Sequence, residues 1–306
     1  MLSLLSGSLI QRPYVFFFLA VSLVVSSVQL GYRRTTLLFL LAWGVAFLSE
    51  FSSTRNGFPY GYYEYLETTR DSELWVANVP FFDSLSYTFI AYSAYATALL
   101  AYSPLLRRGA DVQLVDTHRL RQSWPVALLG GVFVTWLDIV VDPVALRGSR
   151  WFLGQIFWYP TGGLYFGVPL SNFAGWAIVG TTIIFLFQGI DRFLVKRGWM
   201  SERGVRHMPA KALLGPALYA LLLAFNLMIT FAIGEPLLGC VGLFIFTPIT
   251  TLLLALVFKP ANQATAEELK AHLQDFPASP LMPWLRYSGI QKGEGDGGAP
   301  RSMAME

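Results

Sequence analysis

Seven long apolar stretches constrain this chain more than any other feature of its sequence. A helix that crosses a bilayer needs about 20 mostly apolar residues, and stretches near that length recur along most of the chain. We expect spans at 14–31, 36–51, 79–103, 124–141, 169–190, 212–233 and 237–257. Charged residues make up only 13% of the chain, against about 25% in soluble domains. The sequence therefore predicts an all-α polytopic membrane helix bundle with about seven transmembrane helices.

The distribution of Lys and Arg predicts how the bundle is oriented. Cytoplasmic loops of membrane proteins are enriched in these two residues. Seventeen of the 22 lie after the first, third and fifth expected spans or in the C-terminal tail. We therefore expect a multi-pass protein of the cell membrane, with its N-terminus outside and its C-terminus in the cytoplasm.

The chain divides into a membrane part and a tail. We expect 1–260 to form the helix bundle and 261–306 to form a cytoplasmic tail. The tail begins with Thr265 followed three residues later by Glu268, a capping-box pattern that predicts a short helix. From about Ser288 it is rich in glycine and charge, which is typical of disordered segments.

Composition also argues against nucleic-acid and metal sites. The net charge is only +3, and the basic residues are better explained as topology signals than as a nucleic-acid surface. The single cysteine, Cys240, lies in an apolar run, and His118, His207 and His272 lie far apart in polar segments. We therefore expect the lipid bilayer as a partner, no nucleic acid and no metal.

Acidic residues gather at one end of the expected bundle. Ionisable groups within a membrane are costly and mark candidate functional sites. With the orientation above, the outer ends of the spans carry Glu50, Asp83, Asp138, Asp142, Asn172 and Glu235. A carboxylate at the end of a span can also simply reach the headgroup layer, and we favour this simpler interpretation for Asp83 and Glu235.

Glu50, Asp138 and Asp142 are stronger candidates for catalytic residues. They lie at helix C-termini, where the helix dipole disfavours another negative charge. Asp138 and Asp142 are four residues apart, so a continuous helix places both on one face. Like charge, the dipole and partial burial all favour the protonated form of at least one carboxyl group. A carboxylic acid that stays protonated near neutral pH can act as a general acid.

Aromatic, kinked segments surround these acids. The stretch NGFPYGYYEY, 56–65, follows Glu50, and 147–176 is rich in Gly and Pro and lacks a helical period until Asn172. We expect both segments to fold back over the mouth of the bundle. Their rings form either an ordinary aromatic belt at the interface or a pocket that stabilises a developing carbocation. The residues that we expect to bind substrate are Tyr60, Tyr63, Tyr87, Trp136, Trp158, Tyr165 and Asn172.

Two sequence blocks resemble a known family of membrane enzymes. The first, 136–176, reads WLDIVVDPVALRGSRWFLGQIFWYPTGGLYFGVPLSNFAGW, and the second runs from Glu50 through NGFPYGYYEY. They resemble the integral-membrane carotenoid hydratases of the bisanhydrobacterioruberin and γ-carotene hydratase type, which are grouped as carotenoid biosynthesis proteins. The positions that fit the family pattern are Glu50, Gly57, Pro59, Tyr60, Gly61, Tyr63, Tyr65, Asp138, Asp142, Pro143, Trp151, Tyr165, Gly167, Pro169, Asn172, Phe173, Gly175 and Trp176.

This resemblance implies a carotenoid 1,2-hydratase, a hydro-lyase without a cofactor. Such an enzyme adds water to the terminal (1,2 or 1′,2′) double bond of an acyclic carotenoid ψ-end. We expect Asp138 to be the acid, and Asp142 or Glu50 to position the water. The substrate is expected to be dissolved in the membrane, where other enzymes of carotenoid biosynthesis are possible contacts.

The chain departs from the family pattern in two places. Where Val-Pro and then Trp are expected it has Asp83-Ser84 and Tyr87, and Leu137 interrupts the expected Trp-Asp pair. These departures leave the carotenoid and the role of Asp83 open.

Two other classes of protein fit parts of the pattern. A membrane prenyltransferase also uses a D-x-x-x-D spacing, but it needs two acidic motifs to hold Mg²⁺ and diphosphate, and the chain has one such motif. A transporter or binding protein for lipids or carotenoids is the non-enzymatic alternative. A retinal protein is disfavoured, because the last expected span has no Lys before Lys259.

Overall fold

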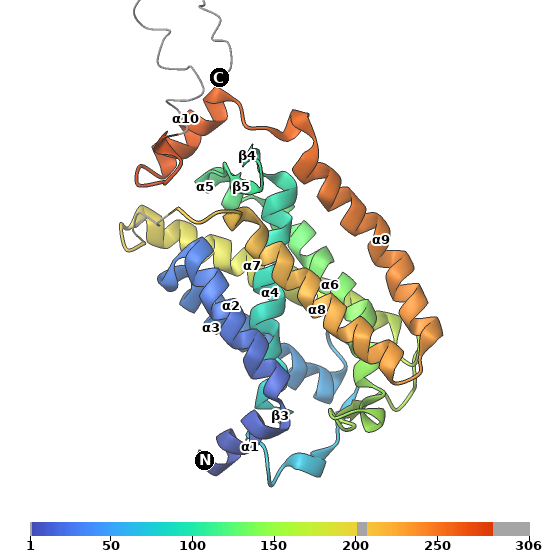
Figure 1. Ribbon diagram of the computed structural model, residues 1–306. Helices are drawn as coiled ribbons and strands as arrows, with labels where there is room; N and C mark the ends of the chain where they lie inside the picture. Colours follow the sequence, from blue (N-terminus) through green and yellow to red (C-terminus); the bar gives the residue numbers. More distant parts are fainter. Residues whose placement is uncertain (1, 201–206, 284–306) are drawn as a thin grey trace, which may run out of the picture.

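Long helices run side by side and form most of the protein (Figure 1). The computed structural model describes residues 2–200 and 207–283. Its α-helices are α1 (Leu2–Gln11), α2 (Pro13–Leu30), α3 (Tyr32–Asn56), α4 (Phe81–Tyr102), α5 (His118–Arg121), α6 (Trp124–Ala145), α7 (Leu170–Lys196), α8 (Leu214–Ala232), α9 (Pro236–Phe258) and α10 (Ala266–Asp275). Its 3-10 turns are η1 (Glu67–Thr69), η2 (Gly148–Arg150), η3 (Lys211–Leu213) and η4 (Pro260–Asn262). The predicted all-α helix bundle is therefore confirmed.

Within the described residues, six helices are long and apolar enough to cross a membrane. They are α2, α3, α6, α7, α8 together with η3, and α9. The expected third span forms α4, which is long enough but less apolar because it carries many Ser, Thr and Tyr side chains. All seven expected helices are thus present, although only six of them have the composition of a span.

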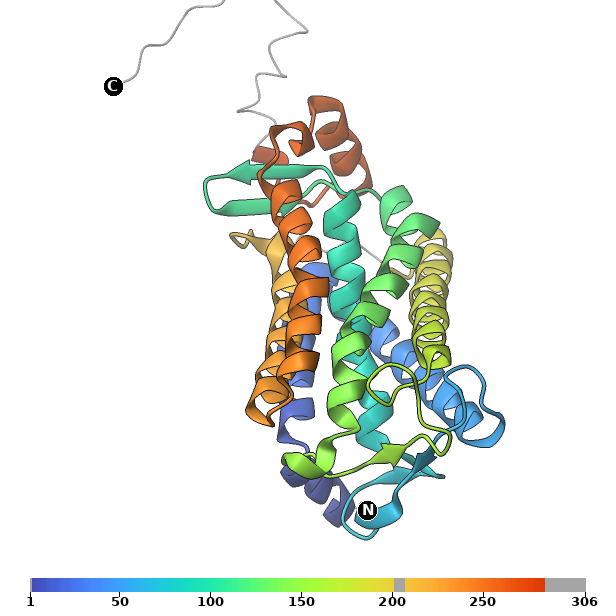
Figure 2. The same cartoon turned by 90° about the vertical axis from the view of Figure 1, so that its right-hand side faces the viewer.

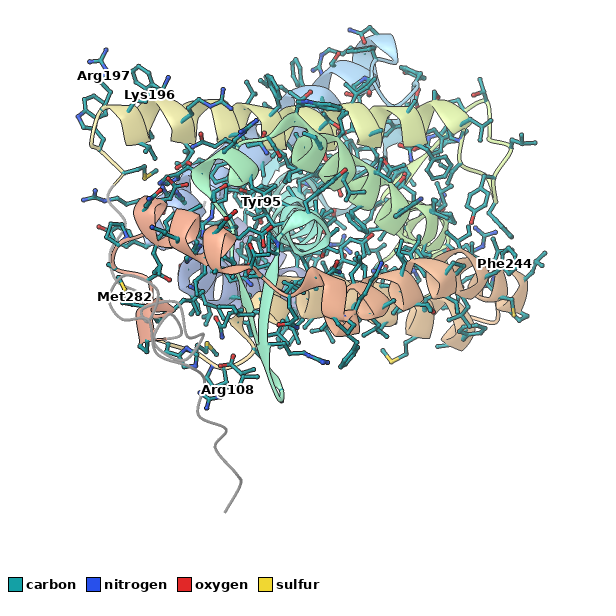
Figure 3. All side chains as sticks on the ribbon, turned by 90° about the horizontal axis from the view of Figure 1, so that it is seen from above. Tyr95, Arg108, Lys196, Arg197, Phe244 and Met282 are labelled. Atoms are coloured by element: carbon teal, nitrogen blue, oxygen red, sulfur yellow. The ribbon has the colours of Figure 1, made fainter. Side chains whose placement is uncertain are left out.

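The position of α4 explains its composition. It packs against α2, α3, α6, α7 and α8, and 16 of its 22 residues are buried. Seen along the bundle, α4 lies in the middle with Tyr95, whereas Phe244 of α9 lies at the edge, 80% exposed (Figure 3). A helix that is surrounded by protein can keep hydroxyl groups that a lipid-facing helix would disfavour.

Two helices extend further than the apolar stretches predict. Helix α3 continues to Asn56 and ends at Gly57, whose φ of 80° is the left-handed conformation that favours glycine at a helix C-terminus. Helix α6 continues to Ala145 and contains Asp138 and Asp142. The expectation that these two aspartates share one helical face is therefore confirmed.

Short strand pairs distinguish the two ends of the bundle. The strands are β1 (Glu64–Tyr65), β2 (Trp75–Val76), β3 (Val79–Pro80), β4 (Leu105–Arg108), β5 (Asp111–Leu114) and β6 (Phe157–Trp158). At the end that carries α1, β1 pairs with β6 and so ties loop 57–80 to loop 146–169. We call this the cavity end, and the opposite end, which carries the β4–β5 hairpin and α10, the hairpin end (Figure 2).

Helix α10 packs onto the bundle instead of standing apart from it. It begins with the predicted capping box, in which Thr265 and Glu268 bond each other's backbone N–H. His272 Nδ1 lies 2.6 Å from the carbonyl oxygen of Asp116, and Leu269 is buried against Val115. The disorder expected from about Ser288 concerns residues outside the described part of the chain.

Candidate active site

Two aspartates of α6 and one asparagine of α7 form the centre of the candidate site. Asn172 Nδ2 donates to Asp138 Oδ2 at 2.7 Å and to Asp142 Oδ2 at 2.6 Å. All three side chains are buried, and Asp138 Oδ1 has no hydrogen-bond partner among the described residues. The two carboxyl groups therefore share one neutral donor, which is costly if both are ionised.

The start of α7 places Asn172 and also holds the loop that covers it. A Cβ atom on Gly175 would lie only 2.8 Å from Tyr60 Cα, so glycine is needed for this close approach. Ser171 Oγ donates to the carbonyl oxygen of Tyr60 at 3.1 Å. The stretch NGFPYGYYEY is thereby fixed against α7, next to Asn172.

Tyr60 and Tyr63 of this loop point into the bundle. Tyr87 of α4 donates its hydroxyl to the Tyr60 hydroxyl at 2.6 Å, and Ser49 Oγ lies 2.9 Å from the same atom. The Tyr87 ring stacks on Trp176 with ring centroids 4.4 Å apart and planes at 11°. Tyr60 and Tyr63 are both buried. The segment therefore forms a wall of the candidate site.

Two further carboxylates face the same region. Ser84 Oγ donates to Glu50 Oε2 at 2.5 Å. The Tyr65 hydroxyl donates to Asp83 Oδ2 at 2.5 Å, and Tyr63 donates in turn to the Tyr65 hydroxyl at 3.3 Å. Glu50 and Asp83 are thus held by hydroxyl groups, as Asp138 and Asp142 are held by an amide.

These side chains enclose a small polar cavity of about 40 Å³. A cavity needs roughly 10–15 Å³ to hold one water molecule, together with several polar partners. The polar cavity therefore has room for water but not for a carotenoid end. It is lined by Glu50, Tyr60, Tyr63, Tyr65, Asp83, Tyr87, Asp142, Phe157, Tyr159, Asn172 and Trp176.

A second, apolar cavity of about 100 Å³ adjoins it. Most of its lining comes from side chains of α2, α4, α6 and α8, including Phe18, Phe89, Leu222 and Phe225. The residues that line both cavities are Asp83, Tyr87, Asp142, Phe157 and Trp176. A carboxyl group and aromatic faces thus stand at the boundary between a polar space and an apolar one.

The loop tyrosines remain neutral hydrogen-bond donors. Burial raises the pKa of Tyr60 and of Tyr63 well above the ordinary value, and the neighbouring Glu50 acts in the same direction. Burial also raises the pKa of Tyr159, whose hydroxyl lies 3.4 Å from Asp142 Oδ2, and Asp142 adds to this effect. Near neutral pH these phenols can donate hydrogen bonds but do not supply negative charge.

The arginine near the site, Arg12, pairs with a carboxylate outside the cavities. Arg12 is buried and forms an ion pair with the buried Glu73, with an Nη2–Oε1 distance of 2.6 Å. It also donates to the carbonyl oxygen of Leu153 and stacks over the Phe82 ring. Across residues 2–200 and 207–283, no three His, Cys, Asp or Glu side chains gather as a metal site.

Comparison with known proteins identifies the family of this chain. The profile of a family described as carotenoid biosynthesis protein matches residues 11–248. The chain belongs to this family. Bisanhydrobacterioruberin hydratase from Haloarcula japonica is 28% identical to it over 199 residues, which cover 63% of this chain and 60% of that protein. The match thus spans less than two thirds of the relative's length, and no solved structure matches the chain.

The family motifs include residues that the structure does not bring to the cavities. Among the described residues, Trp136, Trp158 and Tyr165 lie outside the lining of both cavities. Trp136 packs edge-on against Phe133, and Trp158 is 40% exposed opposite Glu64 in the β1–β6 pair. Asp138 also lies outside the lining, behind Asp142 and Asn172.

Tyr165 and Glu235 lie at other positions of the cavity end. Tyr165 packs edge-on against Phe173, and its hydroxyl is buried without a hydrogen-bond partner among the described residues. Glu235 pairs with Arg147 at 3.0 Å and with Arg150. The hydrogen bond from Arg147, followed by that from Arg150, lowers the pKa of Glu235 below its ordinary value. Glu235 is thus a paired surface carboxylate.

Several residues of the site are not predicted by the sequence. The sequence favours a simple span end for Asp83, but Asp83 lines both cavities. Tyr65 and Trp176 belong to the two sequence blocks that resemble the family, so the family pattern could have indicated them. Ser84 and Tyr159 carry no comparable signal, because only the folded loops and helix packing bring them to Glu50 and Asp142.

Proposed function

We propose that this protein adds water to the terminal double bond of an acyclic carotenoid end. Membership of the carotenoid biosynthesis family and the hydratase name of the Haloarcula relative support this reaction. The observation that carries the proposal is the buried Asp138–Asp142 pair on Asn172, at the boundary between a polar and an apolar cavity. Acid-catalysed hydration needs this combination of a proton donor, a water site and an apolar site.

The first step is protonation of the alkene by the aspartate pair. Asp138 and Asp142 accept hydrogen bonds from the same Asn172 amide, and both are buried. Two such carboxyl groups are more stable when one of them holds a proton. We assign delivery of the proton to Asp142, because it lines both cavities while Asp138 lies behind it. The O–H bond of Asp142 breaks as a C–H bond forms at the secondary alkene carbon.

The second step is stabilisation of the tertiary carbocation that this leaves. The rings of Tyr87, Trp176 and Phe157 stand where the two cavities meet. A cation near the face of such a ring is stabilised by roughly 0.5–2 kcal/mol, and more when it is desolvated. The ionised Asp142 carboxylate adds electrostatic stabilisation on the same side.

The third step is capture of the cation by water from the polar cavity. Glu50 and Asp83 accept hydrogen bonds from Ser84 and Tyr65, so their remaining lone pairs are available to orient water. The water oxygen forms a C–O bond at the tertiary carbon, and its proton passes to a carboxylate. The aspartate pair regains a proton, and the product is a tertiary alcohol.

We further propose that the cavity end faces the outside of the cell membrane. The excess of Lys and Arg on the other side of the bundle supports this orientation. All four carboxylates of the candidate site, Glu50, Asp83, Asp138 and Asp142, then belong to the outer half of the protein. A substrate dissolved in the bilayer reaches them without crossing a soluble domain.

Expression in cells that make lycopene or γ-carotene tests the function. The active protein should convert the pigment into a product that has gained the mass of one water at an acyclic end. Asp142→Asn should remove this product, and Glu235→Gln, a carboxylate change at the same end but outside the cavities, should retain it. Unchanged pigment with well-expressed wild-type protein would overturn the proposal.

A further inference from the structure

The apolar cavity has the properties of a separate hydrocarbon-binding site. Its volume, about 100 Å³, is somewhat smaller than the roughly 150 Å³ of an engineered apolar cavity that stays dry and binds benzene. It can therefore take a few carbon atoms, comparable to one branched end unit of an isoprenoid chain. Water is disfavoured there, because most of the lining offers no hydrogen bond.

An aromatic cluster closes this cavity on the side of α2 and α8. The Tyr14 and Phe225 rings are stacked, with centroids 5.6 Å apart and planes at 18°. Phe18 packs edge-on against Phe225 at 5.5 Å and also contacts Phe89 at 5.7 Å. Helices α2 and α8 are both apolar enough to lie in the membrane, and they contact each other. The cluster thus separates the cavity from the region where α2 and α8 meet lipid.

Exposed apolar side chains on these two helices mark the surface that we expect to face lipid. Phe17 and Val24 of α2 are 56% and 66% exposed, and Met228 of α8 is 60% exposed. Tyr14 and Phe225, in contrast, pack into the bundle and line the cavity. A hydrocarbon that enters between α2 and α8 therefore passes from lipid-facing side chains to an aromatic lining without meeting a charged group.

We propose that the apolar cavity binds the branched hydrocarbon end of an isoprenoid polyene, which enters from the bilayer between α2 and α8. The proposal rests on the proposed function, which needs a terminal alkene at Asp142. It adds a division of roles: the apolar cavity holds the hydrocarbon, and the polar cavity holds the water. Among the described residues, those that line both cavities are Asp83, Tyr87, Asp142, Phe157 and Trp176.

This division has a chemical consequence. A carbocation in water is captured by whichever molecule is nearest, whereas here water can approach only from the polar cavity. The hydrocarbon end is therefore hydrated on one face, at the carbon that reaches the boundary. A chain end too bulky for the apolar cavity, such as a cyclised ring, cannot place its double bond beside Asp142.

Direct binding of lycopene to the purified protein tests the site without requiring turnover. Lycopene is added to detergent-solubilised protein, and binding is followed by quenching of tryptophan fluorescence. Ala145 lines the apolar cavity but not the polar one, so Ala145→Leu should fill it and raise the Kd at least tenfold. Gly44→Leu adds bulk where a side chain meets nothing within 4 Å, and its Kd should be unchanged.

A second variant keeps the test decisive if Ala145→Leu does not fold. Phe225→Ala opens the aromatic cluster and should speed lycopene binding in stopped-flow measurements by several-fold. Asp142→Asn should bind lycopene as wild type does, because it changes the acid but keeps the shape. Lycopene binding with these effects but without a hydrated product would reject the proposed function and keep the binding site. If Ala145→Leu and Phe225→Ala both fold but change neither hydration nor lycopene binding, the apolar cavity is not the binding site. The proposed hydratase function would then still stand.

Discussion

The carboxylates of the candidate site and the buried carboxylates of the hairpin end have different kinds of partner. At the hairpin end, Asp191 accepts a hydrogen bond of 2.7 Å from Arg34, and Asp116 pairs with Arg121. Burial opposes ionisation of Asp116, but the Arg121 charge and the hydrogen bonds from His272 and Arg121 together outweigh it and hold the pKa of Asp116 well below its ordinary value. Each of these carboxylates is thus paired with a guanidinium group.

The four carboxylates of the candidate site have neutral partners instead. Asn172 donates to Asp138 and Asp142, Ser84 to Glu50, and Tyr65 to Asp83. Arg12, which lies near Asp83, makes its ion pair with Glu73. Neutral donors stabilise a buried charge less than a guanidinium does, so these groups can gain and lose a proton at lower cost. Carboxylates paired with arginine thus stabilise the fold, whereas carboxylates held by neutral donors can take part in proton transfer.

The largest effect is expected from the acid itself. Asp142→Asn keeps the shape of the side chain but removes the proton that we assign to catalysis. General acid catalysis contributes about 10²–10⁴-fold to a rate, so hydrated product should fall by about this factor, as measured by pigment chromatography normalised to protein in the membrane. Asp138→Asn should also lose activity, because it removes the partner of Asp142. Wild-type activity in the Asn variants of Asp138 and Asp142 and in Glu50→Gln would break the assignment.

A change at the hairpin end should affect stability instead of chemistry. Arg34→Met leaves Asp191 buried without its guanidinium, and breaking a buried ion pair typically costs about 3–5 kcal/mol. Thermal unfolding in detergent should shift to lower temperature, while turnover per folded molecule stays near wild type. The double variant Arg34→Met/Asp191→Leu should recover part of the stability. A stable Arg34→Met protein without hydratase activity would erase the distinction between the two ends.

A smaller effect is expected where the loop meets α7. Gly175→Ala places a methyl group against Tyr60 and the backbone of Pro59. Overpacking of this kind costs about 1–3 kcal/mol, and the displaced loop should loosen the polar cavity. We expect a several-fold lower rate, with Gly189→Ala as the control, because a Cβ there meets nothing within 4 Å. Equal rates in the two variants would show that the position of the loop is not critical.

The smallest effect is expected from single hydroxyl groups of the loop. Tyr60→Phe removes the hydrogen bonds to Tyr87 and Ser49, which are worth about 0.5–1.5 kcal/mol each. Turnover should fall by less than about tenfold, and Tyr60→Ala, which also removes the ring, should lose more. Unchanged kinetics in Tyr60→Ala and Tyr63→Ala would reduce the segment to an aromatic belt.

Much of the cavity end could be predicted from the sequence, for specific reasons. The distribution of Lys and Arg predicts that the acidic span ends lie at one end of the bundle. The four-residue spacing of Asp138 and Asp142 places them on one face of any continuous helix. The Gly and Pro content of NGFPYGYYEY indicated a folded-back segment, and Gly175 now explains how closely it packs. Each of these inferences depends on short-range sequence patterns.

The remaining features depend on contacts between distant segments. Whether Asp83 faces lipid headgroups or a cavity is decided by Tyr65, whose strand is held by β6, more than 90 residues later in the chain. Trp136 and Trp158 have the composition expected of a pocket but face other surfaces, because helix rotation and strand pairing set their direction. The reduced apolarity of α4 became understandable only when the helix was seen in the centre of the bundle.

Hydration in D₂O tests the central claim most directly. If a carboxylic acid in exchange with solvent protonates the alkene, membranes that contain the wild-type protein should convert lycopene in D₂O into an alcohol with one carbon-bound deuterium. This deuterium should lie on the carbon next to the new tertiary alcohol and should survive back-exchange in ordinary water. Asp142→Asn membranes should give no such product. A hydrated product without carbon-bound deuterium, or equal labelling in the Asp142→Asn variant, would contradict the account.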